Sequence, residues 1–221
     1  MRSVLPSLLF AFSAAASASE SVEIHAFSQV VHRGADISND RPAVGISGSY
    51  DFQSGWFIGG GGYFADGEPS GLSLTRNLNA HIGYFRSLGN DSALEVSISR
   101  NEFIDVADWS YAELRGDWHV NRSFAVMLAY SPDYYGRAAA VNAGLTFRPT
   151  ITDRAYLLAS AGVGRVGGDI DTDIGWLEIG GGISAGRFDL SLSWNTVDND
   201  STGVFGIDRD SVALRVSYRL R

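Results

Sequence analysis

The chain has 221 residues, of which 25 are acidic and 17 basic, so its formal net charge at pH 7 is −8. This acidic balance argues against nucleic acid as a partner, because nucleic-acid-binding domains present basic surfaces. The chain has no cysteine, so disulfides cannot stabilise it. A closed barrel would supply stability in another way, because closure leaves no sheet edge exposed.

The first 18 residues have the pattern of a secretory signal peptide. Arg2 carries the only early charge, an apolar stretch follows from 4 to 16, and Ala16-Ser17-Ala18 forms a small-x-small cleavage site. This apolar run is too short for a membrane-spanning helix. We therefore predict a signal peptide over 1–18 and one domain over 19–221. No later stretch is long enough for a spanning helix, so any membrane span must use β-strands.

Alternation of apolar with small or polar residues begins soon after the predicted cleavage site and continues to the C-terminus. It is clearest at 43–65, where two alternating runs flank a short turn at 53–55, the pattern of an antiparallel hairpin. Most runs have about the 9–11 residues that a tilted strand needs to cross a bilayer. The predicted strands are 22–31, 43–52, 56–65, 77–87, 93–103, 111–120, 124–131, 140–148, 155–165, 176–185, 188–197 and 211–220.

The predicted connections alternate strictly between short and long. Short turns are predicted at 53–55, 87–92, 121–123, 149–154 and 186–187. Longer and more polar loops are predicted at 32–42, 66–76, 104–110, 132–139, 166–175 and 198–210. Transmembrane barrels show this rhythm, with short periplasmic turns, long external loops and both termini in the periplasm. The predicted fold is therefore all-β, a transmembrane antiparallel up-and-down barrel of about 12 strands in the outer membrane of a Gram-negative bacterium.

Aromatic residues gather at the predicted strand ends, as membrane interfaces favour. The group near the short turns is Phe52, Trp56, Tyr84, Trp118, Phe124, Phe147, Phe188 and Tyr218. The group near the long loops is Phe64, Tyr130, Trp176 and Trp194. These groups predict two aromatic belts on a lipid-facing outer wall. A soluble barrel would instead turn its apolar row inward.

One segment resembles a known family. Its residues are Arg33-Gly34, Ser38, Pro42-Ala43, Gly45, Tyr50 and Ser54-Gly55, followed by Gly59. They resemble the opening of the TorF-type porins of the proteobacterial outer membrane. The chain departs from that family at Gly60-Gly61-Gly62-Tyr63, and it ends in Arg221 rather than in an aromatic residue. The resemblance implies an outer-membrane porin, and it supplies no catalytic or substrate-binding residues.

The polar faces of the predicted strands would line the barrel interior. A lumen of twelve strands should be narrower than that of a large porin and controlled by its charged lining. The predicted lining residues are Glu23, His25, Asp51, His81, Glu95, Glu113, Arg115, Asp117, His119, Arg148, Glu178, Asp189, Arg215 and Arg219. If the last strand closes onto the first, Arg219 would lie near Glu23 on one side and Asp189 on the other.

Two readings of this lining remain open. In the first, the chain is a porin-like channel for passive diffusion of small hydrophilic solutes or ions. In the second, the charges neutralise one another inside a closed barrel that is structural or binds a partner through its loops. The expected partners are outer-membrane lipid, lipopolysaccharide, the barrel-assembly machinery and small solutes.

Other motifs give weaker signals. Asp169, Asp171 and Asp173 alternate as calcium ligands can, but the glycine and the terminal glutamate of a calcium loop are missing, so a solvated acidic loop is the better interpretation. The glycines at 162, 164 and 167 match a dinucleotide fingerprint by letter without the βαβ unit that it requires. We predict neither a metal nor a cofactor.

Catalysis is a third possibility. His119 with Asp117 and Glu113 is the best acid–base cluster, but it lacks a nucleophile, and no histidine has the serine partner that a barrel hydrolase needs. The sequence therefore favours a protein that is not an enzyme.

Overall fold

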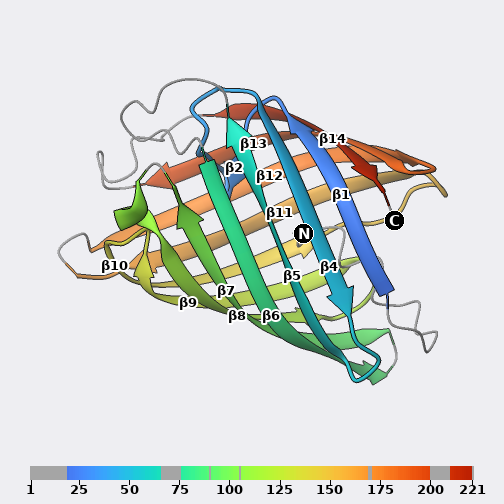
Figure 1. Ribbon diagram of the computed structural model, residues 1–221, viewed down its shortest axis with the longest axis horizontal. Helices are drawn as coiled ribbons and strands as arrows, with labels where there is room; N and C mark the ends of the chain where they lie inside the picture. The colour runs from blue at the N-terminus through green and yellow to red at the C-terminus, as the bar shows by residue number, and fades with distance from the viewer. Residues whose placement is uncertain are drawn as a thin grey trace.

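A computed structural model describes residues 19–65, 76–89, 91–104, 106–168, 171–199 and 210–220. The predicted signal peptide lies outside the described residues. The described residues form one closed antiparallel barrel, with strands that run obliquely around a single wall (Figure 1). Its twelve strands are β1 Ser19–Phe27, β4 Ala43–Asp51, β5 Trp56–Ala65, β6 Arg76–Gly89, β7 Ser92–Phe103, β8 Tyr111–His119, β9 Phe124–Tyr134, β10 Ala138–Phe147, β11 Ala155–Val166, β12 Thr172–Ala185, β13 Phe188–Asn199 and β14 Ser211–Arg219.

The barrel has the up-and-down topology that the loop rhythm predicts. From β4 to β14 each strand pairs with the next one along the chain, and β1 closes the ring by pairing with both β4 and β14. Between β1 and β4 the chain forms a separate two-stranded hairpin, β2 Val31–His32 and β3 Ala35–Asp36. The prediction of twelve antiparallel strands is confirmed.

Side-chain burial confirms the predicted facing of the wall. On β8, Leu114 and Trp118 are each 49% exposed, whereas Glu113 and Asp117 are buried on the opposite face. The same alternation holds on β13, where Leu192 is exposed and Asn195 is fully buried. Because the exposed row is apolar and the buried row is polar, the wall has the inverse arrangement of a soluble barrel, as transmembrane barrels do.

The aromatic belts are confirmed for the outward-facing members that are exposed, among them Trp56, Phe188 and Phe64. The prediction is wrong for Trp176, whose side chain is 7% exposed and lines the interior cavity together with Glu178. These two residues are two positions apart on β12, so they share its inner face.

Some strand boundaries also differ from the prediction. The first strand ends at Phe27 rather than at residue 31, because the chain turns inward before β2. β9 continues to Tyr134, and an irregularity in its pairing with β10 lies between Ala138 and Ala140. β12 begins at Thr172 instead of residue 176, so part of the predicted long loop belongs to the wall.

Aromatic side chains fill the end of the barrel at which the longer connections lie, which we call the long-loop end. This cluster consists of Ile37, Phe103, Trp109, Tyr111, Tyr134, Tyr135, Ala140 and Val166. Trp109 belongs to the three-residue 3₁₀ turn η1 (Ala107–Trp109) between β7 and β8. Four of these residues, Phe103, Tyr111, Tyr134 and Val166, begin or end a strand, so the hydrophobic packing lies at one mouth of the barrel rather than at its middle.

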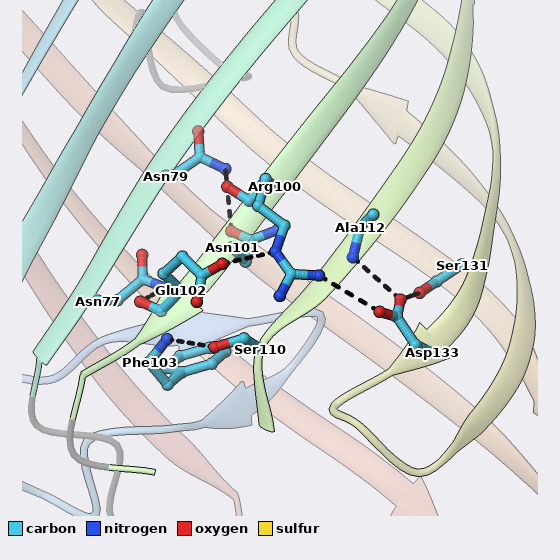
Figure 2. Close-up of polar contacts among 10 residues, drawn as sticks. All are labelled: Asn77, Asn79, Arg100, Asn101, Glu102, Phe103, Ser110, Ala112, Ser131 and Asp133. Atoms are coloured by element: carbon cyan, nitrogen blue, oxygen red, sulfur yellow. Dashed lines mark hydrogen bonds and ion pairs between the residues drawn. The ribbon is translucent and has the colours of Figure 1, made fainter. Parts of the chain in front are cut away.

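A polar network braces the outer wall at the same end. Figure 2 shows Arg100 on β7 between Glu102 and Asp133, with N–O distances of 2.6 and 3.3 Å. Asp133 also accepts hydrogen bonds from the backbone N–H of Ala112 and from the hydroxyl of Ser131. The network therefore ties β7, β8 and β9 together. All three charged groups are exposed, so solvent screens their ion pairs and the contribution of these pairs to stability is small.

Candidate functional site

The barrel encloses a cavity of about 900 Å³. Eight of the predicted lining residues lie in its wall, namely His25, Asp51, His81, Glu95, Glu113, Arg115, Glu178 and Arg215. The other six are buried or half-buried side chains that do not border the cavity, namely Glu23, Asp117, His119, Arg148, Asp189 and Arg219. The polar row that the alternation predicts is thus divided between a cavity lining and a supporting layer.

The supporting layer pairs with arginines. The guanidinium of Arg115 donates two hydrogen bonds to Asp117, at 2.6 and 2.7 Å. Across the seam between β1 and β14, Nε of Arg219 lies 3.2 Å from a carboxylate oxygen of Glu23, as predicted. The predicted neighbour of Asp189 differs: this residue lies opposite Ser217 in the register and forms its ion pair with Arg215, at 4.0 Å.

Neutral polar side chains make up much of the cavity wall, and the search for charged residues missed them. His25 is held between the hydroxyls of Ser47 and Ser217, at 2.8 and 2.9 Å. Further hydroxyl and amide groups in the lining are those of Ser49, Asn79, Ser97, Ser99, Asn101, Thr146, Ser160, Ser191 and Ser193. The same period-two alternation could have found them.

Glycines on the inner wall let aromatic rings lie flat against it. A Cβ at Gly162 would overlap the indole of Trp176, and a Cβ at Gly144 would lie 3.2 Å from the same ring. A Cβ at Gly59 would lie 2.5 Å from Nε2 of His81. These glycines therefore give the rings space beside the wall, and the rings occupy less of the lumen than they would if they projected toward the axis.

The connection between β1 and β4, residues 28–42, forms what we call the inner hairpin. Its base is closed by a hydrogen bond from the N–H of Ile37 to the carbonyl of Val30, at 2.8 Å. The hydroxyl of Ser38, a fully buried residue, accepts from the N–H of Val30 at 2.8 Å. At the tip, Arg33 and Gly34 adopt positive φ angles of 49° and 78°. A Cβ at Gly34 would overlap the backbone oxygen of Thr196 on β13, so the tip requires glycine there.

The tip of the inner hairpin reaches the opposite wall. Arg33 forms an ion pair of 2.6 Å with Glu113 on β8, and the two side chains are 9% and 8% exposed. Its guanidinium also donates to the hydroxyl of Tyr134 on β9, at 3.3 Å. In the ring, β9 lies opposite β1 and β8 is the next strand to β9, so this segment crosses the lumen.

The inner hairpin bounds the cavity. His32, Arg33, Gly34 and Ile37 all belong to the lining, and Ile37 packs into the aromatic cluster at the long-loop end. The prediction of an external loop over 32–42 is therefore wrong. Three of the residues that resemble the TorF-type porins, Arg33, Gly34 and Ser38, are the ones that shape and anchor this hairpin.

His32 is buried in the inner hairpin, with the ring of Tyr135 at its edge and a centroid distance of 6.5 Å. Burial, together with the positive charges of Arg33 and Arg115, lowers the pKa of His32 from 6.5 to about 3. Its Nε2 is buried and makes no hydrogen bond within the described part of the chain. The imidazole of His32 is therefore neutral at pH 7, and it avoids repulsion from the two neighbouring arginines.

The weaker motifs do not contribute to the cavity. Asp169 lies outside the described residues, and Asp171 and Asp173 both pair with Arg165, at 2.6 and 3.0 Å. Gly162 and Gly164 are strand residues of β11. His119 has Glu95 as its nearest carboxylate, at 3.9 Å, and neither of its ring nitrogens is hydrogen-bonded within residues 19–220 as described.

The barrel resembles solved structures of outer-membrane porins. The KdgM porin matches with a TM-score of 0.54 and 12% identity, over 90% of this chain and 97% of that chain. The NanC porin matches with a TM-score of 0.57 and 8% identity, over 89% and 97%. An outer-membrane channel from Pseudomonas putida F1 matches with a TM-score of 0.52 and 11% identity, over 94% and 96%. No protein-family model and no curated protein matches the chain. At these identities the likeness establishes the fold.

Proposed function

We propose that the chain is a porin-like channel of the Gram-negative outer membrane, through which small hydrophilic solutes or ions diffuse passively. The observation that carries this proposal is a polar cavity of about 900 Å³ inside a barrel whose outer wall is apolar. An apolar outer face suits lipid, and a polar lumen suits water and hydrophilic solutes. The fold that the chain shares with KdgM and NanC supports the same function.

Several finer assignments belong to this proposal. Residues 1–18 are removed on export, both termini lie in the periplasm, and the long-loop end faces outward. Lipopolysaccharide and the barrel-assembly machinery are partners. The resemblance at Arg33-Gly34 and Ser38 supports membership of the TorF-type porins. The fourteen inner charged and histidine residues line or support the solute path.

The mechanism combines size exclusion with the electric field of the lining. The inner hairpin narrows the path at the long-loop end, because it spans the lumen from β1 to β8. Below it, hydroxyl and amide groups replace the hydration of a passing solute, and fixed charges select by sign. No catalytic role is proposed for His119, because its buried ring has no nucleophilic partner in the described structure.

The inner hairpin also favours a second candidate, a closed barrel. A buried ion pair across the lumen is compatible with a permanent plug, and the barrel would then act through its wall or its loops. Single-channel recording of the refolded protein in planar bilayers distinguishes these functions. The porin proposal expects discrete conductance steps whose size changes with Arg115→Ala and not with Arg122→Ala, an exposed arginine at a short turn. A sealed bilayer with folded, heat-modifiable protein would overturn it.

A further inference from the structure

The arginines that border the cavity all have carboxylate partners. Arg33 pairs with Glu113 at 2.6 Å, and Arg115 pairs with Asp117 at 2.6 Å. Arg215 faces Asp189 at 4.0 Å. An arginine whose charge is matched by a nearby carboxylate contributes little net field to the rest of the cavity. The sign of the electrostatic potential in the cavity therefore depends on its other charged groups.

Two carboxylates in the lining have no such match. Neither Glu95 nor Glu178 forms an ion pair with an arginine in the described residues, and Arg215 acts on Glu178 only through its charge at longer range. The nearest basic group to Glu95 is the imidazole of His119, at 3.9 Å, and Glu178 accepts a hydrogen bond from Ser193. β7 and β12 carry these two residues on opposite sides of the ring, with four strands between them on one side and six on the other. A solute in the cavity thus has an acidic group on each side.

The remaining lining suits cations as well. Hydroxyl and amide oxygens beside Glu178 and Glu95, among them those of Ser160, Ser193 and Ser97, can replace part of a cation's hydration shell. Carboxylate rings are a known basis of cation selectivity in channels. One structure of KdgM is a complex with oligogalacturonate, an anionic ligand, so the two barrels share a fold but need not share a solute.

We propose that this cavity selects small cations over anions of the same size, and that Glu95 and Glu178 are the residues that determine this selectivity. The inference rests on the proposed channel function for its physiological meaning. Its physical content, a negative potential inside the cavity, is independent of whether the channel opens.

The first test is the reversal potential of the refolded channel in a KCl gradient. We expect a K⁺ over Cl⁻ permeability ratio of about five or more, which corresponds to an interaction of about 1 kcal/mol with the lining. Glu95→Gln combined with Glu178→Gln should bring the ratio close to one. The matched control is Glu102→Gln on the outer wall, outside the cavity lining (Figure 2), which should leave the ratio unchanged. A wild-type preference for Cl⁻, or an unchanged ratio in the double variant, would overturn the proposal.

The second test needs no current, so it separates this proposal from the proposed function. The chain has no cysteine, which allows a single reactive thiol to be introduced. Ser160→Cys places the thiol in the lining directly opposite Glu178, and Ser87→Cys provides an exposed reference. In detergent micelles, a cationic thiosulfonate reagent should modify the thiol of Ser160→Cys faster than an anionic one, by about fivefold relative to the reference position. Glu178→Gln should remove that difference.

Equal rates for the two reagents at position 160, or a faster anionic reagent, would overturn the selectivity proposal even if the protein conducts. A sealed bilayer together with a cationic preference at position 160 would reject the channel function and retain the negative cavity.

Discussion

At the scale of single residues, His32 makes the inner hairpin sensitive to acid. Its pKa is about 3 in the folded protein, against 6.5 when the ring is free in water. Between these pH values the unfolded state binds a proton at His32 that the folded state does not bind. The unfolding free energy therefore decreases as the pH falls from 6.5 toward 3. The loss amounts to about 1.4 kcal/mol per pH unit in that range. His32→Phe, which keeps an aromatic edge against Tyr135, should remove this part of the pH dependence.

Unfolding by urea in detergent micelles at pH 7 and pH 5 measures this effect. The difference in unfolding free energy between the two pH values should be smaller in His32→Phe than in the wild type by about 2 kcal/mol. An equal difference in the two proteins would show that other groups govern the acid sensitivity.

Gly162 offers a second prediction at the residue scale, on the packing of Trp176. An alanine Cβ there would overlap the indole ring and lie 2.5 Å from the carbonyl of Ala143. Gly162→Ala should therefore lower the unfolding free energy by about 1–3 kcal/mol, the usual cost of overpacking. Gly116→Ala is the matched control, because a Cβ at Gly116 has nothing within 4 Å. It should be neutral or slightly stabilising. If both variants behave alike, Trp176 has room to move.

Some of these residue-scale features could be predicted from the sequence, and others could not. Period-two alternation assigns Glu95, Glu113 and Glu178 to the inner face, because strand geometry leaves each side chain one face or the other. Trp176 was assigned wrongly because an aromatic residue near a strand end fits a membrane belt and an inner wall equally well. Its place depends on Gly162 on the adjacent strand β11 and on Gly144 on β10, one strand further along, and single-sequence periodicity does not relate one strand to another.

At the scale of elements, the inner hairpin was the main feature that the sequence did not predict. The polar residues of 28–42 are as typical of an external loop as of a segment inside a polar lumen. Its inward course depends on long-range contacts, from Arg33 to Glu113 and from Gly34 to Thr196. Such contacts have no local signature. By contrast, local alternation and loop length predict the number and order of the twelve wall strands correctly, and only some strand ends differ.

Arg33→Ala should release the inner hairpin. The substitution leaves Glu113 buried without its partner, and breaking a buried pair in this way costs about 3–5 kcal/mol. The substitution leaves the backbone hydrogen bonds between the wall strands intact. It should therefore destabilise the docked position of the inner hairpin rather than the barrel. We expect larger conductance steps, with more frequent fluctuations between levels, in planar bilayers.

Arg122→Ala is the control for this variant. Arg122 pairs with Asp91 at 3.0 Å in an exposed position at the short turns, where such a pair contributes less than about 1 kcal/mol. Its conductance should equal that of the wild type. Glu113→Gln combined with Arg33→Ala should restore part of the lost stability, because no buried charge is then left uncompensated. Unchanged step size in Arg33→Ala would show that the hairpin does not limit the path.

At the scale of the whole molecule, the stability of the barrel depends on how it closes. β1 and β14 share five registered pairs, whereas β11 and β12 share twelve. The seam is also the one join that brings the two ends of the domain together, and the Glu23–Arg219 ion pair lies within it. A join with fewer ladder hydrogen bonds opens at a lower free energy than its neighbours, so we expect unfolding to begin there.

A disulfide across the seam tests this expectation. Ala26 and Val216 are registered partners on the outer face of β1 and β14, and registered antiparallel residues have Cα separations of about 4.5–5.5 Å, within the range that a disulfide spans. Ala26→Cys with Val216→Cys should raise the unfolding free energy by about 2–4 kcal/mol when oxidised, because the bond encloses nearly the whole domain. The oxidised variant should also resist heat conversion to the unfolded band on gels, and reduction should abolish the gain.

The matched control joins Ala143 and Val163, registered partners on β10 and β11, through the same pair of cysteine substitutions. This bond closes one short hairpin, so the loss of unfolded-state entropy is smaller, and the join it reinforces is already well paired. If the barrel opens at the seam, the disulfide between positions 26 and 216 should slow unfolding more than the disulfide between positions 143 and 163. The difference should exceed the part that the two loop lengths explain. Equal slowing by the two bonds would mean that the ring unfolds as one cooperative unit. The pairing of β1 with β14 would then be no weaker than any other strand pairing.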